Sequence, residues 1–311
     1  MTWPALHAVA ATRLGSAREA RWLVEAVAGE QWPAATPVSE QARSRFEALV
    51  DRRTGGEPLQ YVIGSWVFRT LDLMVDRRVL IPRPETEQVV EVALAELDRL
   101  RAEATDGARP AGRSAPPVVT VDLGTGSGAI ALSVAAERPA VEVWATDVSP
   151  AALEVAAANL AGLGGRAAAR VRLAEGAWWA ALPEHLRGRV DLVISNPPYI
   201  SAAEMTAVDA QVTGWEPSLA LEAGPTGLEA IREILNGALA WLRPGGVAVV
   251  EIAPHQRRQA AAMAQDAGFA AVELHPDLAG HPRALVARVA PTTGPAAPGP
   301  AAPGPAAPAP T

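Results

Sequence analysis

The sequence contains no cysteine, so disulfide bonds, zinc–thiolate sites and thiol nucleophiles are excluded, and we expect the protein to lie in the cytoplasm. It also contains no lysine, and all 27 of its basic residues are arginine. Because alanine, proline and glycine are abundant as well, we interpret this bias as a property of the genome rather than of the function. The five histidines are not closely spaced, and we therefore expect no metal site.

Long apolar runs are missing too. No segment approaches the roughly 20 apolar residues that a membrane-spanning helix needs, and Met1 to Trp22 has no basic stretch before a sustained apolar run. We therefore expect a protein that is neither exported nor inserted in a membrane. The formal net charge of -7 argues against stable binding of nucleic acid through its phosphates, although it leaves room for a local basic patch.

The 311 residues, 49% of them hydrophobic, are enough for a soluble globular enzyme of two domains. Residues 1–57 are predicted to form a small helical domain, because Ala17 to Val27 mixes apolar and charged residues at helical spacing and Ser39 is suited to cap a helix that runs to Val50. Gly55 to Pro58 breaks this pattern. Tyr61 to Ile81 then alternates polar and apolar residues, which predicts a β-hairpin linker over residues 58–84.

From Val118 onward, strand patterns alternate with helical ones, which is typical of a parallel sheet with crossover helices. Helices are predicted at 85–103 and from near Gly128, Pro150, Gly227 and His255. The predicted fold class is α/β, with a seven-stranded doubly wound, Rossmann-like sheet in a domain over residues 85–290. Thr105 to Pro117 is predicted to be a loop, and the Pro/Ala-rich residues 291–311 to be disordered. The predicted strands are 118–123, 141–146, 170–173, 190–195, 246–252, 270–274 and 284–289.

A glycine-rich segment at 122–128 follows the first of these strands and opens a helix, where glycines let the backbone approach a ligand closely. Asp147 ends the next strand, where a carboxylate can accept hydrogen bonds from both hydroxyls of a ribose. Together they predict a site for a nucleoside-containing ligand; the alternatives are a plain strand-to-helix turn and a helix cap. The candidate ligand contacts are Asp122, Gly124, Thr125, Gly126, Ser127, Gly128 and Asp147.

Dinucleotides and S-adenosylmethionine both bind at this corner of an open α/β sheet. Two details favour S-adenosylmethionine as the cofactor. The glycines are spaced Gly-x-Gly-x-Gly rather than in the Gly-x-Gly-x-x-Gly fingerprint of dinucleotide sites, and Asp122 at the strand tip is placed to meet the ammonium group of the ligand.

The segment Asn196-Pro197-Pro198-Tyr199 follows an apolar strand and predicts the reaction site. A planar amide or amine nitrogen is a poor nucleophile, so an enzyme that methylates it must hold the nitrogen in line with the methyl group. The side-chain oxygen of Asn196 and the carbonyl of Pro197 are two acceptors for its N–H groups. The two prolines restrict the backbone, and Tyr199 can lay its ring on a planar substrate. The alternative is that the prolines merely end a strand.

From Pro58 to Val289 the chain resembles the HemK-type protein-(glutamine-N5) methyltransferases. The segments that carry the resemblance are Pro58-Leu59-Gln60-Tyr61-Val62-Ile63-Gly64, Phe68, Val79-Leu80-Ile81-Pro82-Arg83-Pro84-Glu85-Thr86-Glu87, Asn196-Pro197-Pro198-Tyr199-Ile200 and Glu216-Pro217. The Asn-Pro-Pro-Tyr segment also occurs in adenine-N6 DNA methyltransferases and several RNA methyltransferases, which leaves these as an alternative function. The segment at Ile81 is more specific to the HemK type.

The resemblance implies a class I methyltransferase that modifies the Gly-Gly-Gln loop of class I peptide chain release factors and docks them partly on its helical domain. It implies that the glutamine enters between residues 196–199 and 82–87, with Arg83, Glu85 and Thr86 near the substrate, and that Trp178 and Asn196 contact the cofactor. One position departs: Ala177 stands where the family often has an acidic residue, which puts a hydrogen bond to adenine in doubt. Structural alternatives are Trp178 as a core residue and Arg83 in a surface ion pair with Glu85 or Glu87. A silent adaptor with the same ligand is a third hypothesis for the whole chain.

Overall fold

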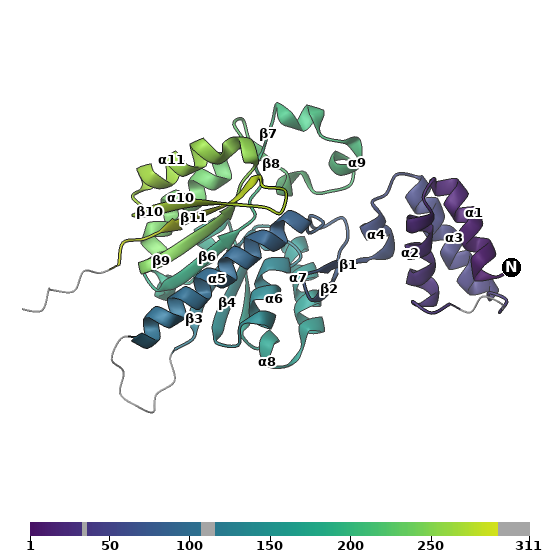
Figure 1. Cartoon of the computed structure of the whole chain (residues 1–311), viewed down its shortest axis with the longest axis horizontal. Coiled ribbons are helices and arrows are strands. Elements are labelled where there is room, and N and C mark those ends of the chain that lie inside the picture. The colour runs from purple at the N-terminus through teal and green to yellow at the C-terminus, as the bar shows by residue number, and fades with distance from the viewer. Residues whose placement is uncertain (33–35, 107–115, 292–311) are drawn as a thin grey trace, which may run out of the picture.

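The computed structural model describes residues 1–32, 36–106 and 116–291. Its N-terminal helices pack as a bundle at one end of the molecule (Figure 1). The Ser39 hydroxyl accepts a hydrogen bond from the N–H of Ala42 at 3.2 Å, which confirms Ser39 as a helix cap. The bundle has a core of its own, in which Leu23 and Phe46 are almost completely buried. Its helices are α1 (Trp3–Leu14), α2 (Ala17–Ala28) and α3 (Glu40–Thr54).

A short helix, α4 (Leu59–Ile63), follows the bundle where the sequence predicted the start of a hairpin. The prediction was wrong for these residues because Leu59 and Val62 lie about one helical turn apart and both pack into the core of the bundle. Arg52 holds this helix in place, since its guanidinium donates to the carbonyls of Tyr61 and Val62 at 2.9 and 3.2 Å. Part of the predicted linker therefore belongs to the helical bundle.

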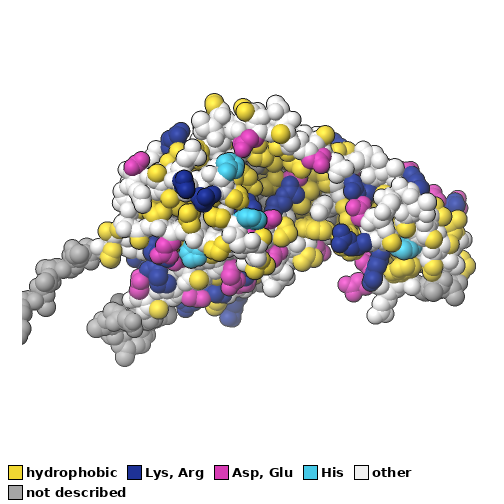
Figure 2. Space-filling view, turned by 45° about the horizontal axis from the view of Figure 1, so that its top comes forward, with side chains coloured by type: hydrophobic (Ala, Val, Ile, Leu, Met, Phe, Trp, Pro, Cys, Tyr) yellow, Lys and Arg dark blue, Asp and Glu magenta, His cyan; other side chains and the backbone are white. Residues whose placement is uncertain are grey.

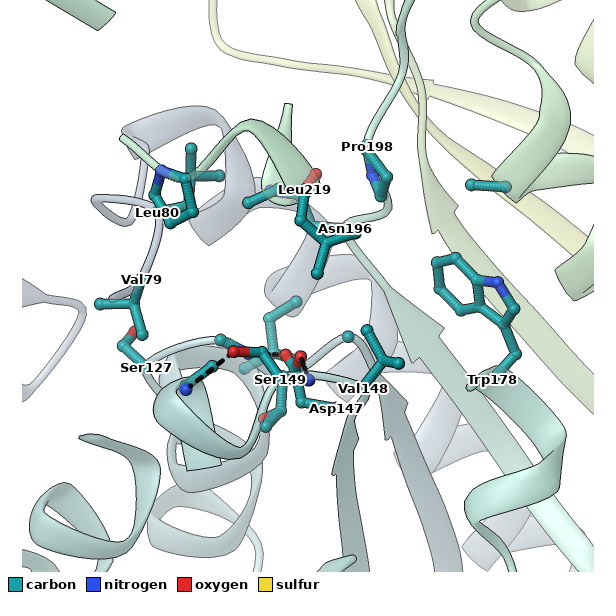
Figure 3. A pocket seen from close by; sticks show the side chains of 18 of the residues that line it. Val79, Leu80, Ser127, Asp147, Val148, Ser149, Trp178, Asn196, Pro198 and Leu219 are labelled. Carbon is teal, nitrogen blue, oxygen red and sulfur yellow. Dashed lines mark hydrogen bonds between the residues drawn. The ribbon is translucent and has the colours of Figure 1, made fainter. Parts of the chain in front are cut away.

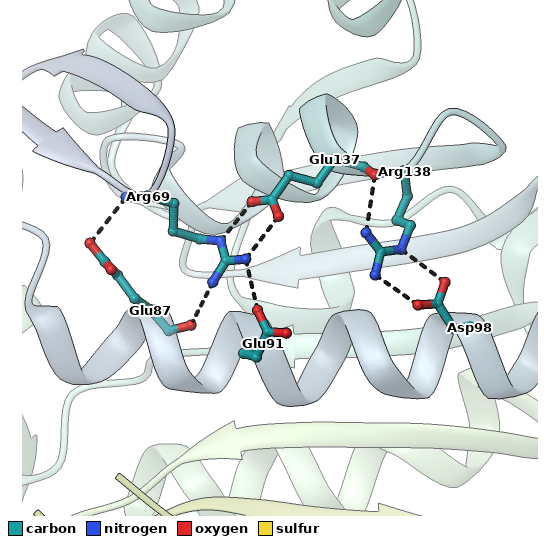
Figure 4. A network of polar contacts seen from close by, with 6 residues as sticks. All are labelled: Arg69, Glu87, Glu91, Asp98, Glu137 and Arg138. Carbon is teal, nitrogen blue, oxygen red and sulfur yellow. Dashed lines mark hydrogen bonds and ion pairs between the residues drawn. The ribbon is translucent and has the colours of Figure 1, made fainter. Parts of the chain in front are cut away.

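The hairpin consists of β1 (Ser65–Phe68) and β2 (Leu71–Met74), and Arg69 at its turn fastens it to the main domain. The Arg69 guanidinium donates to both carboxylate oxygens of Glu137, at 2.6 and 2.8 Å, and to Glu91 at 2.9 Å (Figure 4). Its backbone N–H donates to the Glu87 carboxylate at 3.0 Å. Glu87 and Glu91 lie one turn apart on α5, and Glu137 ends α6, so one cation ties the hairpin to two helices.

The main domain contains the seven-stranded sheet that the sequence predicted, in the order β10-β11-β9-β6-β3-β4-β5. Strand β11 runs antiparallel to both of its neighbours, and the other strand pairs are parallel. The carboxyl ends of β3, β4, β5, β6 and β9 therefore meet at one edge. The strands are β3 (Val118–Leu123), β4 (Val141–Asp147), β5 (Val171–Glu175), β6 (Val190–Ser195), β9 (Leu242–Glu251), β10 (Ala271–Pro276) and β11 (Pro282–Arg288).

Helices cover both faces of this sheet (Figure 1). Val90, Leu94 and Leu97 of α5 are at most 1% exposed, and burial of each such side chain stabilises the fold by about 1.5–3 kcal/mol. In the described part of the chain, no helix is both long enough and apolar enough to cross a bilayer. One face carries α5 (Pro84–Asp106), α6 (Ala129–Glu137), α7 (Pro150–Leu163) and the short α8 (Gly165–Ala168), and the other carries α10 (Glu229–Trp241) and α11 (Arg257–Ala267).

Helix α5 continues to Asp106, so the predicted loop begins later than Thr105, and the rest of that loop lies largely outside the described residues. The predicted disordered tail falls outside them as well, except for its first residue. A lobe that the sequence did not predict follows β6 near the edge of the sheet (Figure 1). It contains β7 (Ile200–Ser201), η3 (Glu204–Ala207), α9 (Ala210–Thr213), η4 (Ser218–Ala220) and β8 (Glu222–Gly224).

Candidate functional site

A cavity of about 570 Å³ opens at the carboxyl edge of the sheet (Figure 3). Its floor is formed by the loops that follow β3, β4, β5 and β6, which is where open α/β sheets bind ligands. The segment before α5, the lobe after β6 and α10 complete its walls. Of the residues predicted from the sequence, those that line the cavity are Thr86, Gly124, Thr125, Gly126, Ser127, Asp147, Trp178, Asn196 and Pro198.

The glycine-rich loop turns sharply at the tip of β3. Gly124 and Gly126 have φ angles of +76° and +55°, a region that side chains other than glycine adopt only with strain. Asn159 of α7, which is 7% exposed, supports the loop from below, because its Nδ2 donates to the carbonyl of Ser127 at 2.8 Å. The same amide donates to the carbonyl of Met74 at 3.0 Å and accepts from the Met74 N–H at 2.7 Å. The loop is therefore joined to strand β2 of the hairpin.

Asp122 lies beneath this loop and does not line the cavity, in contrast to the expected contact with a ligand ammonium. Its Oδ2 accepts hydrogen bonds from the Thr125 hydroxyl at 2.6 Å and from the Ala131 N–H at 3.1 Å. Its Oδ1 is buried and has no partner among the described residues. Burial raises the pKa of Asp122 to about 7, because the charged form loses its hydration. In this structure Asp122 holds the loop in shape.

Asp147 is half-buried and lines the cavity. Its Oδ2 accepts from the N–H of Gly126 and its Oδ1 from the N–H of Ser149, both at 2.9 Å. A carboxylate oxygen can accept a second hydrogen bond, so both oxygens stay able to bind ligand hydroxyls. The helix cap of α7 is instead the Ser149 hydroxyl, which accepts from the Ala152 N–H at 3.2 Å. Burial raises the pKa of Asp147.

Two neighbouring tryptophans, Trp178 and Trp179, have different surroundings. Trp178 has a φ of +48°, a strained value for a side chain of this size, and its indole lies against the cavity across from Gly124. Trp179 is buried, stacks on Trp241 with ring centroids 6.1 Å apart, and donates through Nε1 to the Ile234 carbonyl at 3.2 Å. The core alternative therefore applies to Trp179 rather than to Trp178. Ala177 is exposed and lines the cavity beside Trp178.

The loop after β6 contributes Asn196 and Pro198 to the cavity (Figure 3). Pro197 is buried, and Tyr199 is not among the residues that line the cavity. The Tyr199 carbonyl accepts from Nε2 of Gln256 at 2.9 Å, which fixes the end of the loop. Burial, together with the smaller effect of the nearby Glu251, raises the pKa of the Tyr199 hydroxyl to about 12. Tyr199 is therefore neutral over the physiological range of pH.

Asn196 is held by a chain of hydrogen bonds that the sequence did not predict. Its Nδ2 donates to the Thr86 hydroxyl at 3.1 Å, and that hydroxyl donates to Oε2 of Glu251 at 2.7 Å. Glu251 is 1% exposed, and burial raises its pKa to about 7. The sequence does carry a signal for this residue: Glu251 is a single carboxylate at the carboxyl end of the apolar run Val247 to Val250, on the strand next to β6.

Arg83 forms its ion pair with Glu216 of the lobe, at 2.6 Å, and not with Glu85 or Glu87 as the sequence suggested. Glu87 binds the hairpin turn, and Glu85 forms no hydrogen bond or ion pair with any described residue. Arg83 lines a second cavity, of about 440 Å³, which lies between the helical bundle and the main domain. Contacts with the first cavity that sequence patterns did not reveal come from Leu80, Val148, Ser149 and Leu219.

The comparisons with known families divide the chain in two. Residues 9–64 match the model of the PrmC N-terminal domain, and residues 115–213 match that of the methyltransferase small domain. Similar proteins include the release factor glutamine methyltransferase of Cereibacter sphaeroides, which is 44% identical over 81% of this chain and 82% of its own length. That of Moorella thermoacetica is 42% identical over 79% of this chain and 80% of its own length.

Among solved structures, the chain is similar to the hMettl16 catalytic domain in complex with the MAT2A 3'UTR hairpin 1. The TM-score is 0.52 at 13% sequence identity, and the match covers 83% of each chain. This likeness extends to the class I, Rossmann-like methyltransferase fold alone.

Proposed function

The chain belongs to the release factor glutamine methyltransferase family, and from this premise we propose that it methylates the side-chain nitrogen (N5) of the Gly-Gly-Gln glutamine in class I peptide chain release factors, with S-adenosyl-L-methionine as methyl donor. The observation that carries the proposal is the amide of Asn196, which lines the same cavity as the glycine-rich loop and Asp147. The residues that we propose for nucleoside binding and an acceptor for an amide N–H therefore line one cavity. Release factors act in the cytoplasm, where we place the reaction.

The cavity fits the proposed cofactor in size and chemistry. Its volume of about 570 Å³ lies in the ordinary range of small-molecule pockets. The two oxygens of Asp147 are acceptors for the ribose hydroxyls, the indole of Trp178 offers a flat apolar surface for adenine, and the turn at Gly124 and Gly126 brings backbone close to the ligand. Ala177 supplies no acceptor for the adenine amino group, so we assign adenine binding chiefly to Trp178 and its surroundings.

The chemistry that S-adenosylmethionine supplies when bound is a methyl group on a positively charged sulfur. The chain's own task is to orient the glutamine amide, whose lone pair is delocalised. Asn196 Oδ1 and the Pro197 carbonyl would accept its two N–H groups and so direct the lone pair of the nitrogen. The nitrogen would form a bond to the methyl carbon as the bond between that carbon and the sulfur breaks, and it would lose one proton to water or a carboxylate. No strong base is needed.

We propose that the helical bundle is a docking domain for the release factor. The second cavity is lined by Arg18 and Trp22 of α2, by Trp66 of the hairpin and by Arg83. Its position between the two domains suits a protein substrate that reaches both. We propose that the glutamine enters between Asn196 and the segment with Arg83, Glu85 and Thr86.

Incubation with methyl-labelled S-adenosylmethionine and a purified release factor tests the function. We expect one methyl group per release factor, located on the loop glutamine by mass spectrometry. No label on the wild-type factor, or equal label after the loop glutamine is changed to alanine, would refute the proposal. Adenine-containing DNA and RNA in parallel reactions test the competing nucleic-acid activity, and cofactor binding without any turnover would indicate an adaptor.

A further inference from the structure

Three side chains from three separate elements form one hydrogen-bonded line behind the reaction loop. Thr86 lies in the first turn of α5, Glu251 ends β9, and Asn196 follows β6. Strands β6 and β9 pair in parallel with Ser195 opposite Val250, so the register itself places Asn196 beside Glu251. Thr86 is 3% exposed and joins the two. Strand pairing and the packing of α5 therefore fix the order Asn196, Thr86, Glu251 along this line.

The chemistry of these groups fixes the direction of the line. A carboxylate has no proton to donate, so the Thr86 hydroxyl must donate to Glu251. The hydroxyl then has only lone pairs left for Asn196, which must donate through Nδ2. Oδ1 of Asn196 accepts from no described residue and is not among the fully buried atoms without a partner. It is thus the acceptor that stays open to the cavity.

We propose that Thr86 and Glu251 are positioning residues, which keep the Asn196 amide turned with Oδ1 toward the substrate, and that protonation of Glu251 reverses this arrangement. The proposal rests on the proposed glutamine methylation. A protonated Glu251 donates to the Thr86 oxygen, the Thr86 hydroxyl donates to Asn196 Oδ1, and Nδ2 turns to the cavity. An N–H group there faces the N–H of the glutamine, and the hydrogen bond that orients the substrate is lost.

The surroundings of Glu251 place this proton change near neutral pH. Arg283 on β11 and Arg83 favour the carboxylate, whereas Glu85 on α5 favours the protonated form. Tyr199 of the reaction loop is neutral. Loss of hydration is the largest influence and raises the pKa of Glu251 to about 7. Turnover should therefore rise with pH through this range.

Two variants break the line at different points. Glu251→Gln removes the proton change, and Thr86→Val removes the hydroxyl while keeping the shape of the side chain. We expect kcat to fall roughly tenfold in Thr86→Val, as for the loss of one orienting hydrogen bond, and the acid decline of kcat to disappear in both variants. Thr86→Ser keeps the hydroxyl and should restore both. Glu96→Gln, which alters a buried carboxylate on the far part of α5, should keep the wild-type pH profile.

Asp122 also has a pKa near 7, but it shapes the cofactor loop, so its titration should appear in cofactor affinity rather than in kcat.

A readout that needs no turnover separates this inference from the proposed function. The Nδ2 signal of Asn196 in the ¹⁵N spectrum is identified by its loss in Asn196→Ser. This signal should shift with pH near 7 in the wild type and in Glu96→Gln, but not in Glu251→Gln or Thr86→Val. A signal that titrates unchanged in Glu251→Gln, or an acid decline of kcat that persists there, would overturn the role of Glu251. Wild-type kcat in Thr86→Val would overturn that of Thr86.

Discussion

Arg83 and Glu216 are 133 positions apart in the sequence, yet Nη2 of Arg83 donates to Oε1 of Glu216 at 2.6 Å. Glu216 is also the acceptor for the backbone N–H of Ile81, at 3.4 Å, and its side chain is 2% exposed. The pair therefore ties the segment before α5 to the lobe after β6, and residues of both segments line each of the two cavities.

We expect Glu216→Ala to loosen this connection and leave Arg83 without its partner. Hydrogen exchange should become faster in residues 200–224 and the KM for the release factor should rise, whereas cofactor affinity changes less. Glu204→Gln, at an exposed position of the same lobe, is the control. Unchanged exchange in Glu216→Ala would show that the pair does not hold the lobe.

Removal of the Asn196 amide should affect the reaction more than the binding. We expect Asn196→Ala to lower kcat by roughly 100-fold or more, with a smaller change in cofactor affinity. Steady-state kinetics together with calorimetric titration of S-adenosylmethionine check this. Turnover equal to that of the wild type would remove Asn196 from the role that we assign to it.

The two neighbouring tryptophans offer a matched pair of substitutions. Trp178→Ala should weaken cofactor binding about tenfold, since it removes the flat wall of the cavity, and should cost little stability. Trp179→Ala should lower the free energy of unfolding by about 3–5 kcal/mol, because its ring is buried and stacked on Trp241. Titration calorimetry and urea unfolding measure both effects. The reverse pattern would contradict the placement of the two rings.

Arg69 should matter for stability far more than Arg138, although both form two-pronged ion pairs beside helix α5 (Figure 4). The Arg69–Glu137 pair is 14% and 20% exposed, whereas Asp98, the partner of Arg138, is 57% exposed. We expect a loss of about 2–4 kcal/mol for Arg69→Ala and of less than about 1 kcal/mol for Arg138→Ala. Urea unfolding at low ionic strength compares them; equal losses would contradict this ranking.

The stability of the ligand-free protein should have its maximum at about pH 4–5, close to the pKa values of the unfolded carboxyls. Burial raises the pKa values of Asp122 and Glu251 to about 7. What these two groups add to the free energy of unfolding is therefore fully present below the pKa of the unfolded carboxyls and is lost as the pH rises through 7. Arg69 lowers the pKa of Glu137, and Arg288 lowers that of Glu96 although burial acts in the opposite direction. The stability that these two carboxylates add is therefore lost as the pH falls below the pKa of an unfolded carboxyl. Urea unfolding across pH 3–9 measures the curve. A double substitution, Asp122→Asn with Glu251→Gln, should flatten its alkaline side only.

The sequence predicted the seven strands and the helices between them because apolar periodicity is a local property. Asp147, Trp178 and Asn196, which were predicted as site residues, line one cavity because the carboxyl ends of parallel strands meet at one edge. The short helix α4 was missed because its apolar residues are buried against the helical bundle, a partner that the local pattern does not reveal.

The environment of a side chain was harder to predict than its position. Asp122 was expected to contact the ligand, but it is covered by the loop that it supports. Arg83 was expected to pair nearby if at all, and its partner comes from a lobe without regular sequence pattern. Thr86 and Glu251 meet only because α5 and β9 pack together, which no spacing along the chain encodes.

The hydrogen bonds of the Asn159 side chain couple the movements of two segments. One buried amide group forms hydrogen bonds with the carbonyl of Ser127 in the glycine-rich loop and with both backbone groups of Met74 in the hairpin. Movement of either segment without the other would strand a polar group away from water. The loop and the hairpin should therefore move together, and the helical bundle that leads into the hairpin is coupled through it to the floor of the first cavity.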